Sequence, residues 1–194
     1  LRVQDSVQGD LLGTLSDEGY EADLLMLVAR SGAALREKLG AGKLEQQAAD
    51  AAHATLPATP EAAKFYADGL DKLRVFDALG ARTALEKAIA EDERHALARA
   101  ALAASWSMLG YAAKAREQSQ IALDLSTNLA REDQLMIQGR ARESALQWKE
   151  AAEAYRTLLG FFPDNIDYGL RLADAQISAG DAKEGLGTIE KLRQ

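Results

Sequence analysis

A small residue followed by two further packing residues, four and seven positions later, is the recurring pattern of this chain. In the segment "WKEAAEAYRTLLGFFPDN" (148–165) these positions are Ala151, Tyr155 and Leu158. Spacings of four and seven place side chains on one face of an α-helix. Three further segments share the pattern: Ala81, Leu85, Ala88; Ala115, Ser119, Ala122; and Gly185, Ile189, Leu192. The leading positions 81, 115, 151 and 185 lie 34, 36 and 34 residues apart, which predicts a helical repeat.

The segment before each of these helices carries a small residue of its own at a fixed position. These residues are Gly69, Ala103, Gly139 and Ala173, again separated by 34, 36 and 34 positions. A residue without a bulky side chain lets two antiparallel helices approach to the short end of the roughly 8–10 Å range of helix pairs. Because one helix hairpin cannot cover its own apolar faces, we expect each hairpin to stack on its neighbours. Pro163 is expected to end the helix that contains Tyr155, with Asp164 or Asn165 as the next N-cap.

These segments resemble the tetratricopeptide repeat family, which combines a small residue in the first helix, a Gly-Asp-type turn, an alanine and an aromatic in the second helix, and a closing proline. The best matches are "LRLADAQISAGDAKEG" (170–185) and Ala151, Tyr155 and Pro163. The resemblance runs from about residue 59 to the end. It implies a mainly α fold, a right-handed α-α superhelix of about four helix hairpins over residues 61–194. The chain departs from the pattern at Gln176, where an aromatic is usual, and at the Phe76 turn.

Residues 1–40 have a different pattern, which predicts a partial α/β module. Short alternating runs on either side of a Gly-Asp pair indicate two strands of a hairpin, and the next segment predicts a helix over Glu21–Leu39 with leucines on one stripe. One hairpin and one helix are too little to bury their own apolar face. The module is therefore expected either to dock on the repeats or to pair with strands of a preceding segment, since a chain that begins at Leu1 reads as part of a longer protein. Residues 41–60 are expected to form a connector with a short helix over roughly 44–54.

The order of these modules gives a second resemblance. The stretch 1–40, followed by "FYADGLDKLRVFDALGARTALEKAIAED" (65–92), is similar to the C-terminal region of bacterial, eukaryotic-like serine/threonine protein kinases, in which a small α/β module precedes tetratricopeptide repeats. Similar modules occur in some bacterial transcriptional regulators and nucleotide cyclases. The resemblance implies that this segment is the sensory or interaction part of a membrane-anchored signalling kinase, outside the cytoplasm.

Composition and charge narrow the classes of partner. The formal net charge is -7, which disfavours nucleic acid and anionic membrane surfaces, because both are bound through clustered Lys and Arg. The longest strongly apolar stretch, "DLLMLVA" (23–29), is far short of the roughly 20 residues that a membrane-spanning helix needs. No cysteine is present, which excludes disulfides, thiolate metal sites and cysteine nucleophiles.

No group of residues in the sequence indicates catalysis. The chain lacks the glycine-rich loop, strand lysine and catalytic-loop aspartate of a kinase, and "LGAGKLE" (39–45) reads as a helix C-cap because it lacks the phosphate-loop spacing. The two histidines, His53 in the connector and His95 at a helix start, have no partners at metal-ligand spacing. Trp106 and Trp148 are expected to pack in the core or at a turn. We therefore expect no catalytic residue, no metal and no cofactor.

The remaining candidate for function is the concave groove, which in this family is lined by the first helix of each repeat. Helical projection predicts an apolar end in repeats one and two and a mixed, acidic end in repeats three and four. The residues expected to bind are Tyr66, Leu70, Leu73, Leu97, Met108, Met136, Arg140, Glu143 and Asp174, with Ala63, Ala100, Ala104, Asp133, Asp167 and Leu170 on the same faces. Such a surface fits an extended or helical peptide. In an equally open alternative, the N-terminal helix or the connector fills the apolar end.

The sequence leaves two function classes open. The leading hypothesis is a non-catalytic scaffold that binds a protein or peptide segment within a bacterial signalling protein. The rival is a module that senses a small molecule or forms a homodimer through the last repeat, where Leu186, Ile189 and Leu192 would be uncovered. Capture of chaperone C-terminal carboxylates, a known function of the family, is disfavoured because Leu70, Leu97 and other residues without positive charge stand at the corresponding positions.

Overall fold

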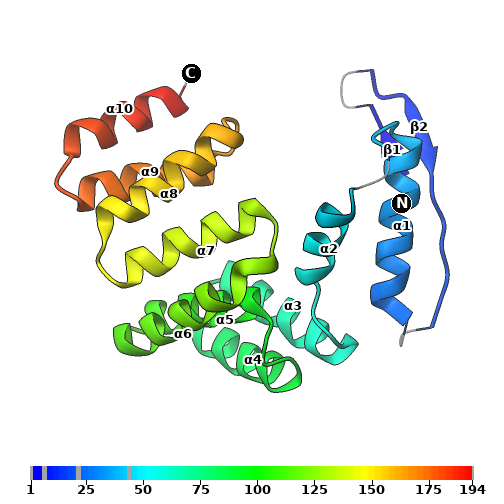
Figure 1. Ribbon diagram of the computed structural model, residues 1–194, viewed down its shortest axis with the longest axis horizontal. Coiled ribbons are helices and arrows are strands. Elements are labelled where there is room, and N and C mark those ends of the chain that lie inside the picture. The colour runs from blue at the N-terminus through cyan, green and yellow to red at the C-terminus, as the bar shows by residue number, and fades with distance from the viewer. Residues whose placement is uncertain (1, 6–7, 21–22, 43–44, 194) are drawn as a thin grey trace.

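The computed structural model describes residues 2–5, 8–20, 23–42 and 45–193 and is mainly helical (Figure 1). The N-terminal elements are β1 (Arg2–Gln4), β2 (Leu11–Thr14), α1 (Leu24–Lys38) and α2 (Gln46–Ala54). The remaining elements are α3 (Pro60–Arg74), α4 (Ala78–Glu91), α5 (Ala96–Met108), α6 (Ala112–Leu125), the 3₁₀-helix η2 (Ser126–Asn128), α7 (Arg131–Ser144), α8 (Trp148–Phe161), α9 (Ile166–Ser178) and α10 (Ala182–Leu192). None of the helices within these ranges has the length and apolar character needed to cross a membrane.

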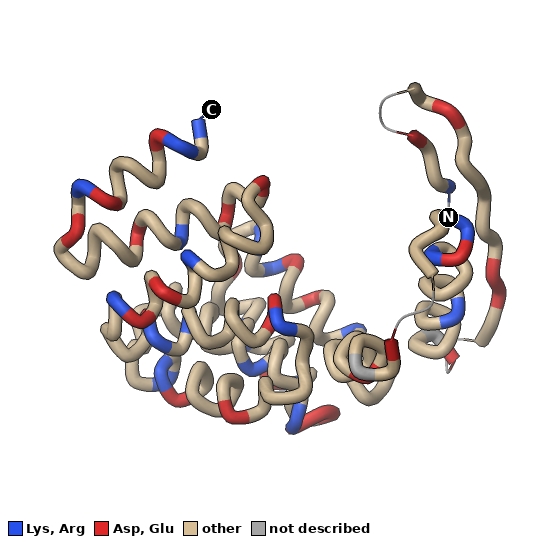
Figure 2. The backbone as a smooth tube through the Cα atoms, turned by 45° about the horizontal axis from the view of Figure 1, so that its top comes forward, with Lys and Arg blue, Asp and Glu red and all other residues tan. Residues whose placement is uncertain are grey.

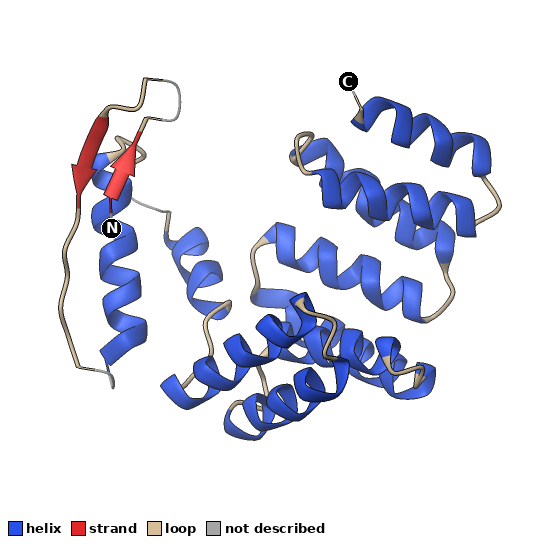
Figure 3. Ribbon diagram, turned by 180° about the vertical axis from the view of Figure 1, so that it is seen from behind, coloured by secondary structure: helices blue, strands red, loops and turns tan. Residues whose placement is uncertain are grey.

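Helices α3 to α10 form four consecutive hairpins that stack into a curved array (Figures 1 and 3). The pairs are α3 with α4, α5 with α6, α7 with α8, and α9 with α10, and each pair packs against the next through α4 and α5, α6 and α7, and α8 and α9. The first helices α3, α5 and α7 also contact one another in sequence, whereas no comparable contact joins the second helices over the described ranges. The first helices therefore line the inner side of the curve. The predicted fold class, stacked helix hairpins after a small β-hairpin and helix, is confirmed.

The turns inside the four hairpins repeat the interval found in the sequence. Each contains one residue in the left-handed region of φ: Phe76 (φ 61°), Gly110 (φ 81°), Leu146 (φ 60°) and Gly180 (φ 95°). These positions are again 34, 36 and 34 residues apart. Glycine adopts this conformation without strain, whereas a bulky L-residue does not. The same turn is therefore imposed at all four hairpins, even where the sequence offers Phe or Leu.

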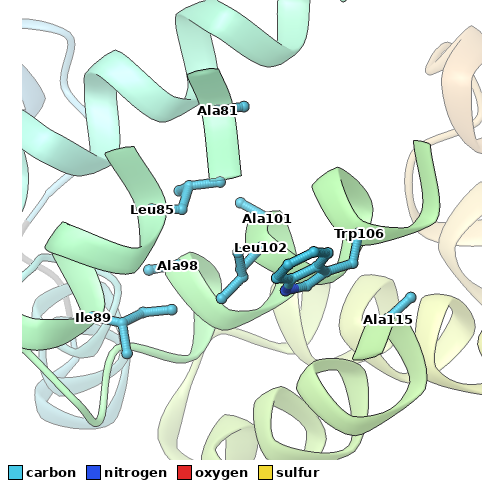
Figure 4. Packing of buried hydrophobic residues seen from close by; sticks show 8 residues of the cluster. All are labelled: Ala81, Leu85, Ile89, Ala98, Ala101, Leu102, Trp106 and Ala115. Carbon is cyan, nitrogen blue, oxygen red and sulfur yellow. The ribbon is translucent and has the colours of Figure 1, made fainter. Parts of the chain in front are cut away.

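The predicted small residues permit close packing within the hairpins. A Cβ atom added at Gly69 would lie 2.6 Å from Cγ of Leu85, and one at Gly139 would lie 2.5 Å from Cε1 of Tyr155. Both partners come from the second helix of the same hairpin, and both are fully buried. Figure 4 shows one resulting core, in which side chains from α4, α5 and α6 point toward one another. The absence of side chains at Gly69 and Gly139 thus sets the distance between paired helices.

The predicted helix ends agree with the structure. Helix α8 ends at Phe161, two residues before Pro163, and the side chain of Asn165 accepts a hydrogen bond from the backbone N–H of Tyr168 at the start of α9. Capping of this kind satisfies a backbone donor that has no partner inside the helix. Of the two predicted caps, Asn165 is the one used.

The N-terminal module is a two-stranded antiparallel sheet beside α1, as the alternating pattern predicts. Polar contacts hold the helix to the β2 side: Arg30 pairs with Asp17, and the Lys38 ammonium donates to the carbonyl of Thr14. The predicted helix began at Glu21, which lies outside the described residues; the observed helix begins at Leu24. The predicted apolar stripe is incompletely covered, because Val28 and Leu39 are exposed.

The connector, but not α1, reaches the array. Helix α2 contacts η2, and the predicted start of this helix at Leu44 falls outside the described part of the chain. In Figures 1 and 3, α1 stands apart from α3, α5 and α7. The alternative in which the N-terminal helix fills the groove is therefore not the arrangement observed.

Candidate binding surface on the inner helices

Most of the predicted apolar groove residues contribute to the core. Tyr66, Leu70 and Leu73 of α3 are half-buried and pack against the cluster formed by α4, α5 and α6. Leu97 of α5 packs against the neighbouring cluster around Ile137, and Met136 of α7 packs against the cluster around Tyr155. These side chains leave less free apolar surface than helical projection predicts. Among the residues that helical projection placed on this surface, Leu170 and Met108 are the most exposed large apolar side chains, at 49% and 44% of their surface.

The charged residues of the prediction form a connected group that we call the inner charge cluster. It consists of Tyr66 from α3; Asp133, Arg140 and Glu143 from α7; Tyr155 from α8; and Arg171 and Asp174 from α9. Arg171 Nη1 lies 3.7 Å from a carboxylate oxygen of Glu143, and the Arg171 guanidinium lies 6.0 Å from the centre of the Tyr155 ring. Three first helices, α3, α7 and α9, and one second helix, α8, therefore contribute to this surface, and its charged side chains come from α7 and α9.

Arg140 is the unusual member of the cluster. Its guanidinium is largely buried, and its Nε atom has no hydrogen-bond partner within the described residues. Burial, followed by the positive charge of Arg171, lowers the pKa of Arg140 from its ordinary value, and the carboxylate of Glu143 acts in the opposite direction. Buried arginines are normally paired, because an uncompensated buried charge is costly. Arg140 therefore keeps a buried donor without a partner among the described residues.

The acidic members are affected by the same burial. Burial raises the pKa of Glu143, and Arg171 partly opposes the shift. Burial, with the nearby charge of Glu132, also raises the pKa of Asp133. Both carboxyl groups thus hold their protons more strongly than an exposed acid does.

Tyr66 joins the first hairpin to this surface. Burial, with the charge of Asp133, raises the pKa of Tyr66 to about 12, and Arg140 opposes the shift. Tyr66 on α3 therefore interacts electrostatically with residues of α7, although the two helices belong to different hairpins. Arg140 thus interacts electrostatically with both Tyr66 and Glu143, and Asp174 also acts on Glu143.

Two members of the cluster were missed as site residues in the sequence. Tyr155 was assigned only to packing, although its hydroxyl lies near Glu143. Arg171 was not among the predicted residues, because the helical projection selected Asp167, Leu170 and Asp174 in this helix. Arg171 lies four residues after Asp167 and three before Asp174, so a projection shifted by one position would have included it.

The other predicted residues behave as core or surface. Trp106 is buried, as expected, with Lys114 Nζ 4.1 Å and the Arg82 guanidinium 5.2 Å from its ring centre. Trp148 is the first residue of α8, and His53 is exposed on α2. In the described ranges, no three His, Cys, Asp or Glu residues gather in a way that could hold a metal ion.

The charges of the array are dispersed. Figure 2 shows acidic and basic positions interspersed along the helices, without a single extended basic stripe. Two open grooves occur at equivalent places in the repeat. One, of about 310 Å³, lies between α4, α5 and α6, and the other, of about 850 Å³, lies between α8, α9 and α10. Their lining residues are related by a 70-residue step, for example Ile89 with Leu159 and Leu102 with Leu172.

Comparison with known proteins does not assign the chain to a family. No protein-family model matches it, and no curated protein sequence matches it significantly. The architecture and the inner charge cluster are therefore the basis for a functional proposal.

Proposed function

We propose that this chain is a non-catalytic scaffold of tetratricopeptide-repeat type that binds a peptide segment of a partner protein on its inner surface. Support comes from four stacked helix hairpins with a near-constant step and from an inner side lined by first helices. Stacked hairpins create extended curved surfaces suited to such segments. The resemblance to kinase C-terminal regions supports the further proposal that the segment is the sensory or interaction part of a bacterial signalling protein.

The observation that carries this proposal is the unpartnered Nε of the buried Arg140. A guanidinium presents its N–H groups in a planar fork that matches a carboxylate. An acidic side chain of the bound segment would therefore offset the buried positive charge, and the flexible thioether of Met108 on α5 offers adaptable apolar contact. Exposed Asp174 would favour a basic or amide group further along the same segment. The proposed ligand is thus a peptide of mixed charge with at least one acidic residue.

Peptide-array screening followed by titration of a selected peptide tests this function. Arg140→Glu reverses the charge at the proposed anchor, and Met108→Arg alters exposed apolar surface without touching the core. Arg131→Glu, an exposed change on the same helix α7, is the matched control. We expect Arg140→Glu to weaken binding at least tenfold and Arg131→Glu to leave it within about twofold, because exposed charges contribute little. Equal affinities for all three variants and the unmodified chain would mean that the inner surface is not the site.

Self-association through the last hairpin is the second candidate. Leu186 on α10 is 59% exposed and Ile177 on α9 is 45% exposed, whereas Leu192 is half-buried against Gly169. The uncovered surface is therefore smaller than the sequence suggested. Light scattering across the micromolar range distinguishes the candidates: a dimer that Leu186→Lys dissociates supports self-association, and a monomer throughout excludes it at these concentrations.

A further inference from the structure

A buried histidine links the connector to the array. His95, at the start of α5, is only 3% exposed. Its Nε2 atom lies 3.1 Å from the carbonyl oxygen of Thr55, forty residues earlier in the chain. Nearby, the backbone N–H of Ala58 donates to Oδ2 of Asp92 at 2.9 Å, and Pro57 is buried. These contacts hold residues 55–59, which we call the connector segment, against the turn between α4 and α5.

The geometry defines the protonation state of the histidine. A carbonyl oxygen only accepts hydrogen bonds, so Nε2 must carry the proton of the neutral ring. The other ring nitrogen, Nδ1, is buried and makes no hydrogen bond to any described residue. A second proton would create a buried N–H without an acceptor, together with a buried positive charge, and both are costly. The docked arrangement therefore fits neutral His95 and opposes the cation.

We propose that His95 is a pH-sensitive latch, which holds the connector segment on the array when neutral and releases it when protonated. A histidine that leaves this site gains water as a partner for Nδ1, so protonation favours the undocked state. The proposal assigns a regulatory role to a residue that the inner surface does not use for contact with its ligand.

The groups around His95 support this direction. Burial lowers the pKa of His95, and the weaker effects of the Thr55 carbonyl and the Asp92 carboxylate oppose the shift. The Tyr66 ring of α3 contacts the imidazole edge-to-face with centres 4.8 Å apart, and its phenol remains neutral because its own pKa is raised to about 12. The undocked ring titrates near its ordinary value of about 6.5. Docking is therefore strongest above about pH 6.5 and weakens as pH falls toward the lowered pKa, by at most about tenfold per pH unit.

The same contact connects the latch to the inner charge cluster. Tyr66 contacts the His95 ring and also interacts electrostatically with Asp133 and Arg140. A protonated His95 ring that turns toward water would withdraw its edge-to-face contact from Tyr66, so peptide affinity would also fall in acid. This consequence rests on the proposed function, whereas the latch itself does not.

Energy transfer between two dyes, measured without any peptide ligand, tests the latch. The chain contains no cysteine, so His53→Cys on exposed α2 and Asn128→Cys on η2 give the two labelling positions, and His95 becomes the sole histidine. We expect constant transfer from pH 8 to pH 7 and a fall toward pH 5. In the same background, His95→Gln supplies an amide donor for the Thr55 carbonyl without a titrating group, and its transfer should not depend on pH. An equal acid-induced fall in both proteins would overturn the proposal.

A direct titration covers the case in which His95→Gln does not dock. Proton NMR of a His53→Gln variant follows the His95 ring alone. A pKa below 6.5 that coincides with the fall in energy transfer supports the latch. A pKa at or above 6.5, or constant energy transfer across the His95 titration, refutes it. Both readouts are independent of peptide binding, so failure of the latch is distinguishable from failure of the proposed function.

Discussion

Replacing Gly139 by alanine tests whether the absence of a side chain sets the packing of the third hairpin. The added Cβ would lie 2.5 Å from Cε1 and 2.6 Å from Cζ of Tyr155. These distances are shorter than those between a Cβ atom and a non-bonded heavy atom in folded proteins. The ring is fully buried in the cluster between α7, α8 and α9, so it has no space into which to move. The substitution therefore forces α7 and α8 apart or displaces the ring.

Two opposing free energies decide the result. Alanine is favoured over glycine in a helix interior by about 1 kcal/mol, whereas overpacking a core costs about 1–3 kcal/mol. A rigid buried ring places Gly139→Ala in the upper part of that range, which leaves a net destabilisation of about 2 kcal/mol. At Gly69 the contact is with the more adaptable side chain of Leu85, so Gly69→Ala should cost about 1 kcal/mol or less.

Gly187 provides the matched control. It lies inside α10, and nothing comes within 4 Å of an added Cβ. Gly187→Ala should therefore stabilise the protein by up to about 1 kcal/mol through helix propensity alone. Urea unfolding followed by circular dichroism gives the three midpoints, and an unchanged slope shows that the same surface is exposed in each case.

A double-mutant cycle identifies the cause. In a Tyr155→Leu background a more adaptable side chain replaces the ring, so the cost of Gly139→Ala should fall to that of Gly69→Ala beside Leu85, about 1 kcal/mol or less. The reasoning is wrong if Gly139→Ala raises the midpoint as Gly187→Ala does, or if its cost is the same with leucine at position 155.

Three further predictions follow from the turns, a cap and a buried acid. Phe76→Gly should stabilise the protein by up to about 1 kcal/mol, because relief of about 1–2 kcal/mol of left-handed strain exceeds the entropy cost of glycine and the side chain is 82% exposed. Gly110→Ala should destabilise the protein, because it introduces the same strain. Thermal melts in which both substitutions shift the midpoint in the same direction would contradict this prediction. Thr59→Ala removes the hydroxyl that accepts from the N–H of Ala62 and should cost about 1 kcal/mol in urea unfolding, whereas no loss would show that the cap is redundant. Burial raises the pKa of Asp133, so ionisation of this carboxyl group reduces the stability of the fold as pH rises through that pKa. Asp133→Asn should therefore raise the urea midpoint at pH 7 but not at pH 3. An equal gain at both pH values would refute an effect of charge.

The spacing of the helix hairpins was predictable because it depends on small residues at fixed positions, which the sequence shows directly. Gly69 and Gly139 reveal where two helices must approach, since a Cβ at either would overlap a buried side chain. Gly110 reveals one left-handed turn. The equivalent turns at Phe76 and Leu146 gave no such signal, because neither residue type favours a positive φ. Packing of the flanking helices imposes the turn there, which is a tertiary effect.

The inner surface was only partly predictable because it depends on the rotation of each helix within the stack. Helical projection gives the residues that share a face, but it does not show how far that face turns toward the neighbouring hairpin. Leu70 and Leu73 were therefore assigned to a free groove, although they pack against the core. The approach of Tyr66 to Arg140 across two hairpins and the contact of His95 with Thr55 join distant parts of the chain, and no periodicity encodes either.

The residues that stability does not explain are the best guide to function in this chain. Replacement of a buried ionic group by well-packed apolar side chains is often neutral or stabilising, so the position of Arg140 does not require a cation for folding. The guanidinium also lacks a hydrogen bond at Nε within the described structure, and nearby Arg171 makes its charge still less favourable. Glu143 is already engaged with Arg171. Under the proposed function, a ligand that brings an acidic group to the inner surface would offset the cost of keeping Arg140 charged there.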